Sequence, residues 1–259
     1  MADKVNIFWF RRDLRLDDNV GFYNALHGKF PVLPIFIFDS EILNELSKDD
    51  ARVTFISETL QNMRNELQKH GSSIAVYQGK PEEIFNKITS EFKIQNVIAN
   101  RDYEPYAKNR DEKIEQLLSK NNIGFYTFKD QVIFEKDEVV KSDGDPYIVY
   151  TPYMKIWKEK FRKDYKEKIY YTSEFLKNLY KNTHLPNLSL SEIGFQKSKI
   201  EIPDYDVTPT TIQEYEEKRN FPAEDSMFLK IFKGVGIEYF RPFIGIVSRG
   251  IPPLKDMGK

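Results

Sequence analysis

Short apolar runs alternate along the first half of the chain with longer stretches whose apolar residues recur at helical spacing. The run over residues 32–38 is apolar at every position, which is typical of a strand buried on both faces of a parallel sheet. The expected strands are residues 5–10, 32–38, 73–78, 96–100 and 124–128. The expected helices, each with one apolar stripe, are residues 52–70, a segment that begins at 81, and residues 106–119. The alternation predicts an α/β fold: a doubly wound, five-stranded, mainly parallel sheet of Rossmann-like type, with helices on both faces.

The polar loops of this region follow the carboxyl ends of the expected strands. In a doubly wound sheet the ligand lies in the crevice beyond those ends. The loops after Phe10, Phe38 and Asn100 are therefore the candidates for a binding site. The sequence contains neither GxGxxG nor GxxxxGK[ST], which excludes the standard dinucleotide fingerprint and the P-loop.

Composition narrows the classes of function. The chain has 39 basic and 40 acidic residues, so a global electrostatic attraction to nucleic acid or anionic membranes is excluded, although a local basic patch is not. It has no cysteine and three scattered histidines, which argues against a metal site. The amino terminus, MADKVNIFWF, resembles neither a secretory signal nor a membrane span. We expect a soluble, cytoplasmic protein without a membrane or metal partner.

The loop after the first expected strand has the highest charge density at the candidate edge. Residues 9–19 read WFRRDLRLDDN, with three arginines and three aspartates. Arg11, Arg12 and Arg15 could hold an anion, or they could pin the chain through pairs with aspartates of the same loop. Self-pairing is the common role of such a loop, whereas its position after the first strand favours a ligand. Both interpretations stay open.

The same string resembles the opening of the photolyase and cryptochrome family, and four later segments match that family in order. They are residues 51–53 (ARV), 101–106 (RDYEPY, followed by Arg110 and Asp111), 144–157 (GDPYIVYTPYMKIW) and 215–226 (YEEKRNFPAEDS). The resemblance implies an α/β antenna domain over residues 1–130 and a domain edge with an interdomain connector over 131–226. A tail over 227–259 shows no family pattern.

Members of the family can hold an antenna chromophore between the α/β domain and a helical domain, which itself holds FAD and the DNA lesion. The resemblance places antenna-binding carboxylates at Asp102 and Glu104 and a basic residue at Arg52. The folate-binding branch has an Asn-Glu pair where this chain has Tyr106 and Ala107, so a deazaflavin or flavin mononucleotide is expected in preference to a folate. The alternative role for the two carboxylates is to cap the following helix, and one residue can do both.

The resemblance also implies what the chain lacks. Tyr215 matches a tyrosine that contacts FAD, but a loop with Thr and Ser that holds the diphosphate should follow at position 227, where this chain reads MFLKI. We therefore expect no FAD retention, weak or no binding of damaged DNA, and no repair by this chain alone. From the loss of pattern after Ser226 we expect a truncated or frame-shifted gene, with a deliberately short protein as the alternative. The cofactor-binding candidates are Phe10, Arg11, Arg12, Asp13, Arg52, Asp102, Glu104 and Tyr215, and no residue is assigned a catalytic role.

We expect the antenna-binding N-terminal domain of a light-dependent DNA repair enzyme, a cyclobutane pyrimidine dimer photolyase, as a monomer. The alternatives are a stand-alone nucleotide- or flavin-binding module and a fragment of a cryptochrome-type blue-light photoreceptor. Residues 165–226 distinguish the stand-alone module, because they resemble an interdomain connector that such a module would have no reason to keep.

Overall fold

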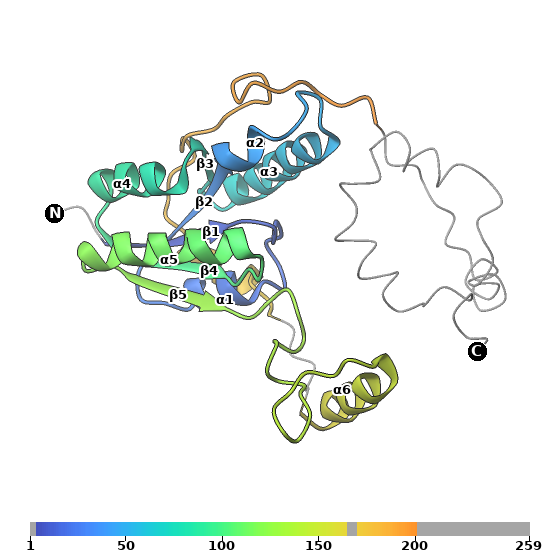
Figure 1. The fold of residues 1–259 in the computed structure, drawn as a ribbon. Coiled ribbons are helices and arrows are strands. Elements are labelled where there is room, and N and C mark those ends of the chain that lie inside the picture. Colours follow the sequence, from blue (N-terminus) through green and yellow to red (C-terminus); the bar gives the residue numbers. More distant parts are fainter. Residues whose placement is uncertain (1–3, 165–169, 201–259) are drawn as a thin grey trace, which may run out of the picture. The chain divides into compact units, whose positions relative to one another are not determined.

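Five parallel strands form one sheet in the computed structural model, which describes residues 4–164 and 170–200 (Figure 1). The strands are β1 (Val5–Phe10), β2 (Val32–Asp39), β3 (Ala75–Gly79), β4 (Ile94–Asn100) and β5 (Gly124–Phe128). Their spatial order is β3-β2-β1-β4-β5, and each neighbouring pair is parallel. The predicted doubly wound parallel sheet is thereby confirmed, with strand bounds that differ from the expected ones by at most two residues.

The helices that join these strands are mostly those that the apolar stripes predict. They are α1 (Val20–Leu26), α2 (Ser40–Leu43), α3 (Ala51–Lys69), α4 (Pro81–Glu91), α5 (Pro105–Lys120) and α6 (Tyr150–Asp164), together with the 3-10 helix η1 (Ser173–Asn178). The periodicity does not reveal α1 and α2, because seven and four residues are too short to repeat an apolar stripe.

Alternating side chains of each strand enter two separate cores, one on each face of the sheet. On β1, Phe8 packs with α1 and α3, whereas Trp9 packs with α4 and α5. Both positions are buried, which explains why β1 is apolar except for Asn6. The helices thus cover both faces, as expected for right-handed crossovers (Figure 1).

Residues 172–198, which lie in the predicted connector, complete the core of the α/β unit. The backbone N–H of Tyr180 donates to the carbonyl of Val32 at 2.8 Å, and the N–H of Val76 donates to the carbonyl of Pro186 at 2.9 Å. Apolar side chains of this segment are buried, namely Leu176, Leu179, Leu185, Ile193 and Phe195. The chain divides into two compact units, and the described residues of this segment belong to the first, together with residues 4–146 and 156–164.

A buried arginine fastens this segment to the sheet. The Arg64 guanidinium, on α3, donates to the carbonyls of Ile74 and Leu185, at 2.9 Å each. Burial lowers the pKa of Arg64 from its ordinary value, because the charged group has left water. Across the two described ranges, no helix is long and apolar enough to cross a membrane.

Candidate functional site

The crevice of the sheet lies between β1 and β4. From β1 the chain crosses through α1 to β2 on one side, and from β4 it crosses through α5 to β5 on the other. The loops that follow the two central strands therefore diverge at the carboxyl edge and leave a ligand position between them. Residues 11–19 and 101–104, which contain most of the candidate residues, are these two loops.

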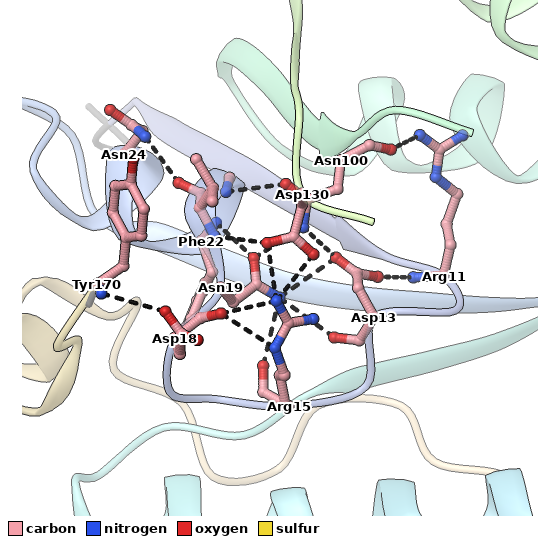
Figure 2. A network of polar contacts seen from close by, with 12 residues as sticks. Arg11, Asp13, Arg15, Asp18, Asn19, Phe22, Asn24, Asn100, Asp130 and Tyr170 are labelled. Atoms are coloured by element: carbon pink, nitrogen blue, oxygen red, sulfur yellow. Dashed lines mark hydrogen bonds and ion pairs between the residues drawn. The ribbon is translucent and has the colours of Figure 1, made fainter. Parts of the chain in front are cut away.

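A buried network pins the loop after β1 to the end of β4 (Figure 2). The Asp13 carboxylate accepts the Arg11 backbone N–H at 2.8 Å, the Asn100 side-chain amide at 2.5 Å and the Asn19 side-chain amide at 3.2 Å. Asn100 in turn accepts the Gly21 N–H at 2.9 Å. A Cβ at Gly21 would lie 2.5 Å from the Asn100 amide oxygen, so this contact requires glycine. Asp13 therefore holds the fold of the loop, which leaves its carboxylate little freedom to bind a ligand.

Two buried arginines share one carboxylate beneath the crevice. The Arg11 side chain is 7% exposed and donates to both oxygens of Asp111, at 2.6 and 2.7 Å. Arg110 donates to the same residue at 3.0 and 3.1 Å. The guanidinium carbons of both arginines lie 4.9 Å from the centroid of the Trp9 ring. Burial, followed by the nearby charge of Arg11, lowers the pKa of Arg110.

Arg11 and Arg15 contact carboxylates outside their own loop, on α5 and just after β5, and these contacts favour a pinning role for both arginines. Arg15 contacts both carboxylate oxygens of Asp130, just after β5, at 2.8 and 2.9 Å (Figure 2). Pairing with the carboxylates of aspartates in the same loop, one of the two interpretations left open, is not formed by Arg11 or Arg15, although the Arg15 guanidinium donates to the Asp18 backbone carbonyl at 3.0 and 2.6 Å. Those aspartates accept backbone N–H groups instead: Asp17 accepts from Thr172, and Asp18 accepts from Tyr170.

Arg12 has the most exposed side chain of the three arginines in this loop, and it brings three of the candidates together. Its guanidinium lies 3.3 Å from an Asp102 carboxylate oxygen and 2.8 Å from one of Glu104. The side chains of Arg12 and Glu104 are each 53% exposed, whereas that of Asp102 is 6% exposed. The Arg12 guanidinium and the Glu104 carboxylate are therefore accessible to solvent, whereas the Asp102 carboxylate is buried.

Neither candidate carboxylate caps α5 in the usual way, although Asp102 accepts a backbone N–H just before the helix. Glu104 occupies the N-cap position of α5, but its side chain makes no capping hydrogen bond, and Pro105 begins the helix. Instead, Asp102 accepts the backbone N–H of Glu104 at 3.3 Å. The carboxylate of Glu104 consequently stays available at the surface apart from its pair with Arg12.

The remaining candidates lie elsewhere on the carboxyl edge or in the core. Arg52, in the first turn of α3, contacts the Asp50 carboxylate at 2.7 Å, and this hydrogen bond lowers the pKa of Asp50. Phe10 is completely buried, with its ring 4.5 Å from that of Phe8, so it supports the edge from below. Tyr215 and the tail over 227–259 lie outside the described residues.

One contact that spans the carboxyl edge is not predicted from the sequence. The Tyr106 hydroxyl donates to the Asp39 carboxylate at 2.6 Å and so joins the end of β2 to the start of α5. Burial, followed by this hydrogen bond, raises the pKa of Tyr106. The sequence marks Asp39 as the polar residue that ends an apolar run. Nothing in the sequence identifies its partner 67 residues away.

An open hollow of about 370 Å³ adjoins Asp102 on the side of α5 and β5. Its lining residues include Arg101, Tyr103, Lys108, Asp111, Phe125 and Glu135. Carboxylates and guanidinium groups of this kind can hold a polar ring or an anion. Within the described ranges, no group of three or more His, Cys, Asp and Glu side chains is arranged to hold a metal ion.

The family model described as DNA photolyase matches residues 6–170 of this chain. A deoxyribodipyrimidine photo-lyase from Synechococcus sp. (strain ATCC 27144) is 32% identical over 151 residues, which are 58% of this chain and 31% of that protein. A deoxyribodipyrimidine photo-lyase from Halobacterium salinarum is 26% identical over 241 residues, 85% of this chain and 50% of that protein. The matched regions thus span about a third to a half of the length of these curated relatives.

The fold also matches the solved structure of a cryptochrome. The crystal structure of a cryptochrome from Synechocystis sp. PCC6803 superposes with a TM-score of 0.68, at 17% sequence identity. The superposition covers 85% of this chain and 50% of that chain. At this level of identity the likeness is one of fold.

Proposed function

Because the chain belongs to the DNA photolyase family, we propose that its α/β unit is an antenna domain that binds a light-absorbing chromophore at the carboxyl edge of the sheet. The observation that carries this proposal is the group of Arg12, Asp102 and Glu104 at the crevice between β1 and β4. A doubly wound sheet binds its ligands at this point. When bound, such a chromophore absorbs light and passes the excitation energy to a second chromophore.

The polar groups at the edge fit a flavin or deazaflavin. The ring systems of both carry an imide N–H that a carboxylate can accept and carbonyl oxygens to which a guanidinium can donate. Flavin mononucleotide adds a phosphate, for which the half-exposed guanidinium groups of Arg12 and Arg52 are suitable partners. These residues would bind and orient the ring. The ion pair of Arg11 with Asp111 and the hydrogen bond from the Arg11 backbone N–H to Asp13 keep the loop in position.

The same edge fits a folate less well. Tyr106 and Ala107 stand where the folate-binding pattern has an amide and a carboxylate. The Tyr106 hydroxyl is occupied by Asp39, and Ala107 is buried with no polar side-chain atom to offer. These two positions support a flavin-type chromophore rather than a folate.

Light-dependent repair of damaged DNA is the activity that we propose for a protein that joins such a unit to an FAD-binding domain. We do not expect the chain alone to perform it, because positions 227–231 read MFLKI rather than a loop rich in hydroxyl groups that could hold the FAD diphosphate. Reconstitution with FAD, photoreduction and an assay of dimer reversal on oligothymidylate would test this expectation. Measurable light-dependent repair would contradict it.

The chromophore proposal is tested by titrating the full chain with flavin mononucleotide, a deazaflavin and a folate, each followed by fluorescence and by retention in gel filtration. We expect saturable binding of one of the two flavin-type ligands. Arg12→Met should weaken it about tenfold, because a charge-assisted contact is lost. Lys69→Gln, in the last turn of α3 at the opposite edge of the sheet, is the matched control and should bind normally. Preferential binding of the folate, or equal binding by the Arg12 variant, would overturn the proposal.

A further inference from the structure

The loop that carries Asp102 is held from a distant part of the chain. Glu135 lies beyond β5, and one of its carboxylate oxygens contacts both neighbours of Asp102. That oxygen accepts the Tyr103 hydroxyl at 2.8 Å and lies 2.8 Å from Nε of Arg101, in an ion pair whose geometry is not that of a hydrogen bond. Asp102 itself contacts Arg12.

We propose that Glu135 is a positioning residue of the chromophore site: by holding the residues on both sides of Asp102, it fixes the Asp102 carboxylate against Arg12 and at the crevice. This inference rests on the proposed function, since it assigns Glu135 a role in that same site. Nothing in the family resemblance or in the sequence pattern singles out this residue.

Glu135 is itself rigidly held, as a positioning residue must be. Its side chain is 23% exposed, and its backbone N–H donates to the Glu138 carboxylate. Glu138 pairs with Lys129 at 2.7 Å, and its backbone carbonyl accepts the Lys160 ammonium group. The contacts between Glu135 and the loop therefore belong to a network of charged groups in residues 129–138, and they are not isolated contacts at the surface.

The loop is aligned with the sheet by a backbone hydrogen bond to β5 and by the contacts of Glu135. The backbone N–H of Arg101 donates to the carbonyl of Phe128 at 2.8 Å, which continues the pairing of β4 with β5 by one residue. Beyond that bond, the Glu135 contacts are the links that join residues 101 and 103 to the segment after β5. Burial, followed by the hydrogen bond to Glu135, raises the pKa of Tyr103, so its hydroxyl remains a donor over the ordinary pH range.

The first measurement uses the unliganded full chain and reports on the Asp102–Arg12 contact directly. In a spectrum of arginine Nε–H groups labelled with ¹⁵N, the Arg12 signal is assigned by its loss in Arg12→Lys. We expect Glu135→Ala to move this signal in the same direction as Asp102→Asn does. Asp137→Ala, which breaks an exposed ion pair with Lys136 in the same segment, is the matched control and should leave it in place. An unmoved signal in Glu135→Ala would overturn the inference.

The second measurement is the affinity for flavin mononucleotide or the deazaflavin, whichever the chain binds. Glu135→Ala should weaken binding about fivefold, and it should have little further effect in the Asp102→Asn background. Glu135→Gln, which keeps an acceptor for Tyr103, guards against general unfolding and should lose less affinity. Independent, additive losses from the Glu135 and Asp102 variants would contradict a positioning role. A wild-type chain that binds no flavin would overturn the proposed function, while the arginine spectrum would still decide whether Glu135 holds Asp102.

Discussion

The Tyr106 hydroxyl and the Asp39 carboxylate form a 2.6 Å hydrogen bond between the start of α5 and the end of β2. Because β1 lies between β2 and β4, this bond crosses above the carboxyl end of the central strand. Asp39 also accepts the Glu41 N–H at 3.0 Å and so begins α2. One carboxylate thus links two helices of opposite faces at the proposed site.

Replacing Tyr106 with Phe should remove this link at a modest cost in stability. The ring remains, but Asp39 loses a donor, which we expect to lower the free energy of unfolding by ~1 kcal/mol. Urea unfolding of the full chain, followed by circular dichroism, would measure the change. Tyr126→Phe, at an exposed position on β5, is the matched control and should be neutral. A Tyr106 variant as stable as this control would show that the bond contributes nothing.

The sequence predicted the sheet well because the physical requirement on its strands is local. Strands buried on both faces are apolar at nearly every position, and β1 and β2 each have a single polar residue, Asn6 and Asp39. The site was predicted less completely. Arg12, Asp102 and Glu104 were named and do meet, but the residues that hold them were found only in the structure.

The contacts that the sequence does not predict share a physical cause. Arg11 reaches Asp111 across 100 positions of sequence, and Glu135 reaches Tyr103 across 32. Such pairs follow from the order of the strands, which brings the loops after β1, β4 and β5 to one edge. Charge counts within the loop over 9–19 suggested internal pairing instead, because they contain no information about what the sheet places beside it.

The burial of Tyr77 should make the fold less stable at high pH. Its hydroxyl has no hydrogen-bond partner among the described residues, and burial raises the pKa of Tyr77 to about 12. Below the ordinary tyrosine pKa, near 10, both folded and unfolded chains keep the proton. Above it the unfolded chain ionises first, so this residue destabilises the fold increasingly between pH 10 and about 12.

Tyr77→Phe therefore has two expected effects. At pH 8 it should be neutral or should stabilise the fold by up to ~1 kcal/mol, because a buried hydroxyl without a partner is removed. At pH 11 the advantage over the wild type should be larger. Urea unfolding of both proteins at the two pH values measures the difference, and Tyr126→Phe again serves as the control. An advantage that shrinks as pH rises would contradict the assignment.

Arg64→Met tests whether residues 172–198 belong to the folded unit. The substitution keeps an apolar chain of similar length, but it leaves the carbonyls of Ile74 and Leu185 without their donor. Leaving buried acceptors unpaired should cost about 2–4 kcal/mol of unfolding free energy. Limited proteolysis should then cleave near residues 183–186 earlier than in the wild type. Lys69→Gln on the same helix should change neither measurement. An Arg64 variant that is as stable as the wild type and is not cleaved earlier would show that these hydrogen bonds are not needed to hold the segment.

Asp111→Asn should be the most destabilising of these changes, because two buried guanidinium groups depend on one carboxylate. Arg11 and Arg110 both contact Asp111, and both lie against the ring of Trp9. Without the negative charge, two cations remain close together in a buried place, for which we expect a loss of about 3–5 kcal/mol. Glu112→Gln, at the exposed neighbouring position, is the control. Unfolding followed through tryptophan fluorescence suits the test, since Trp9 is one of two tryptophans in the chain. If the Asp111 variant unfolds at the same urea concentration as the Glu112 control, the cluster is held by packing rather than by charge.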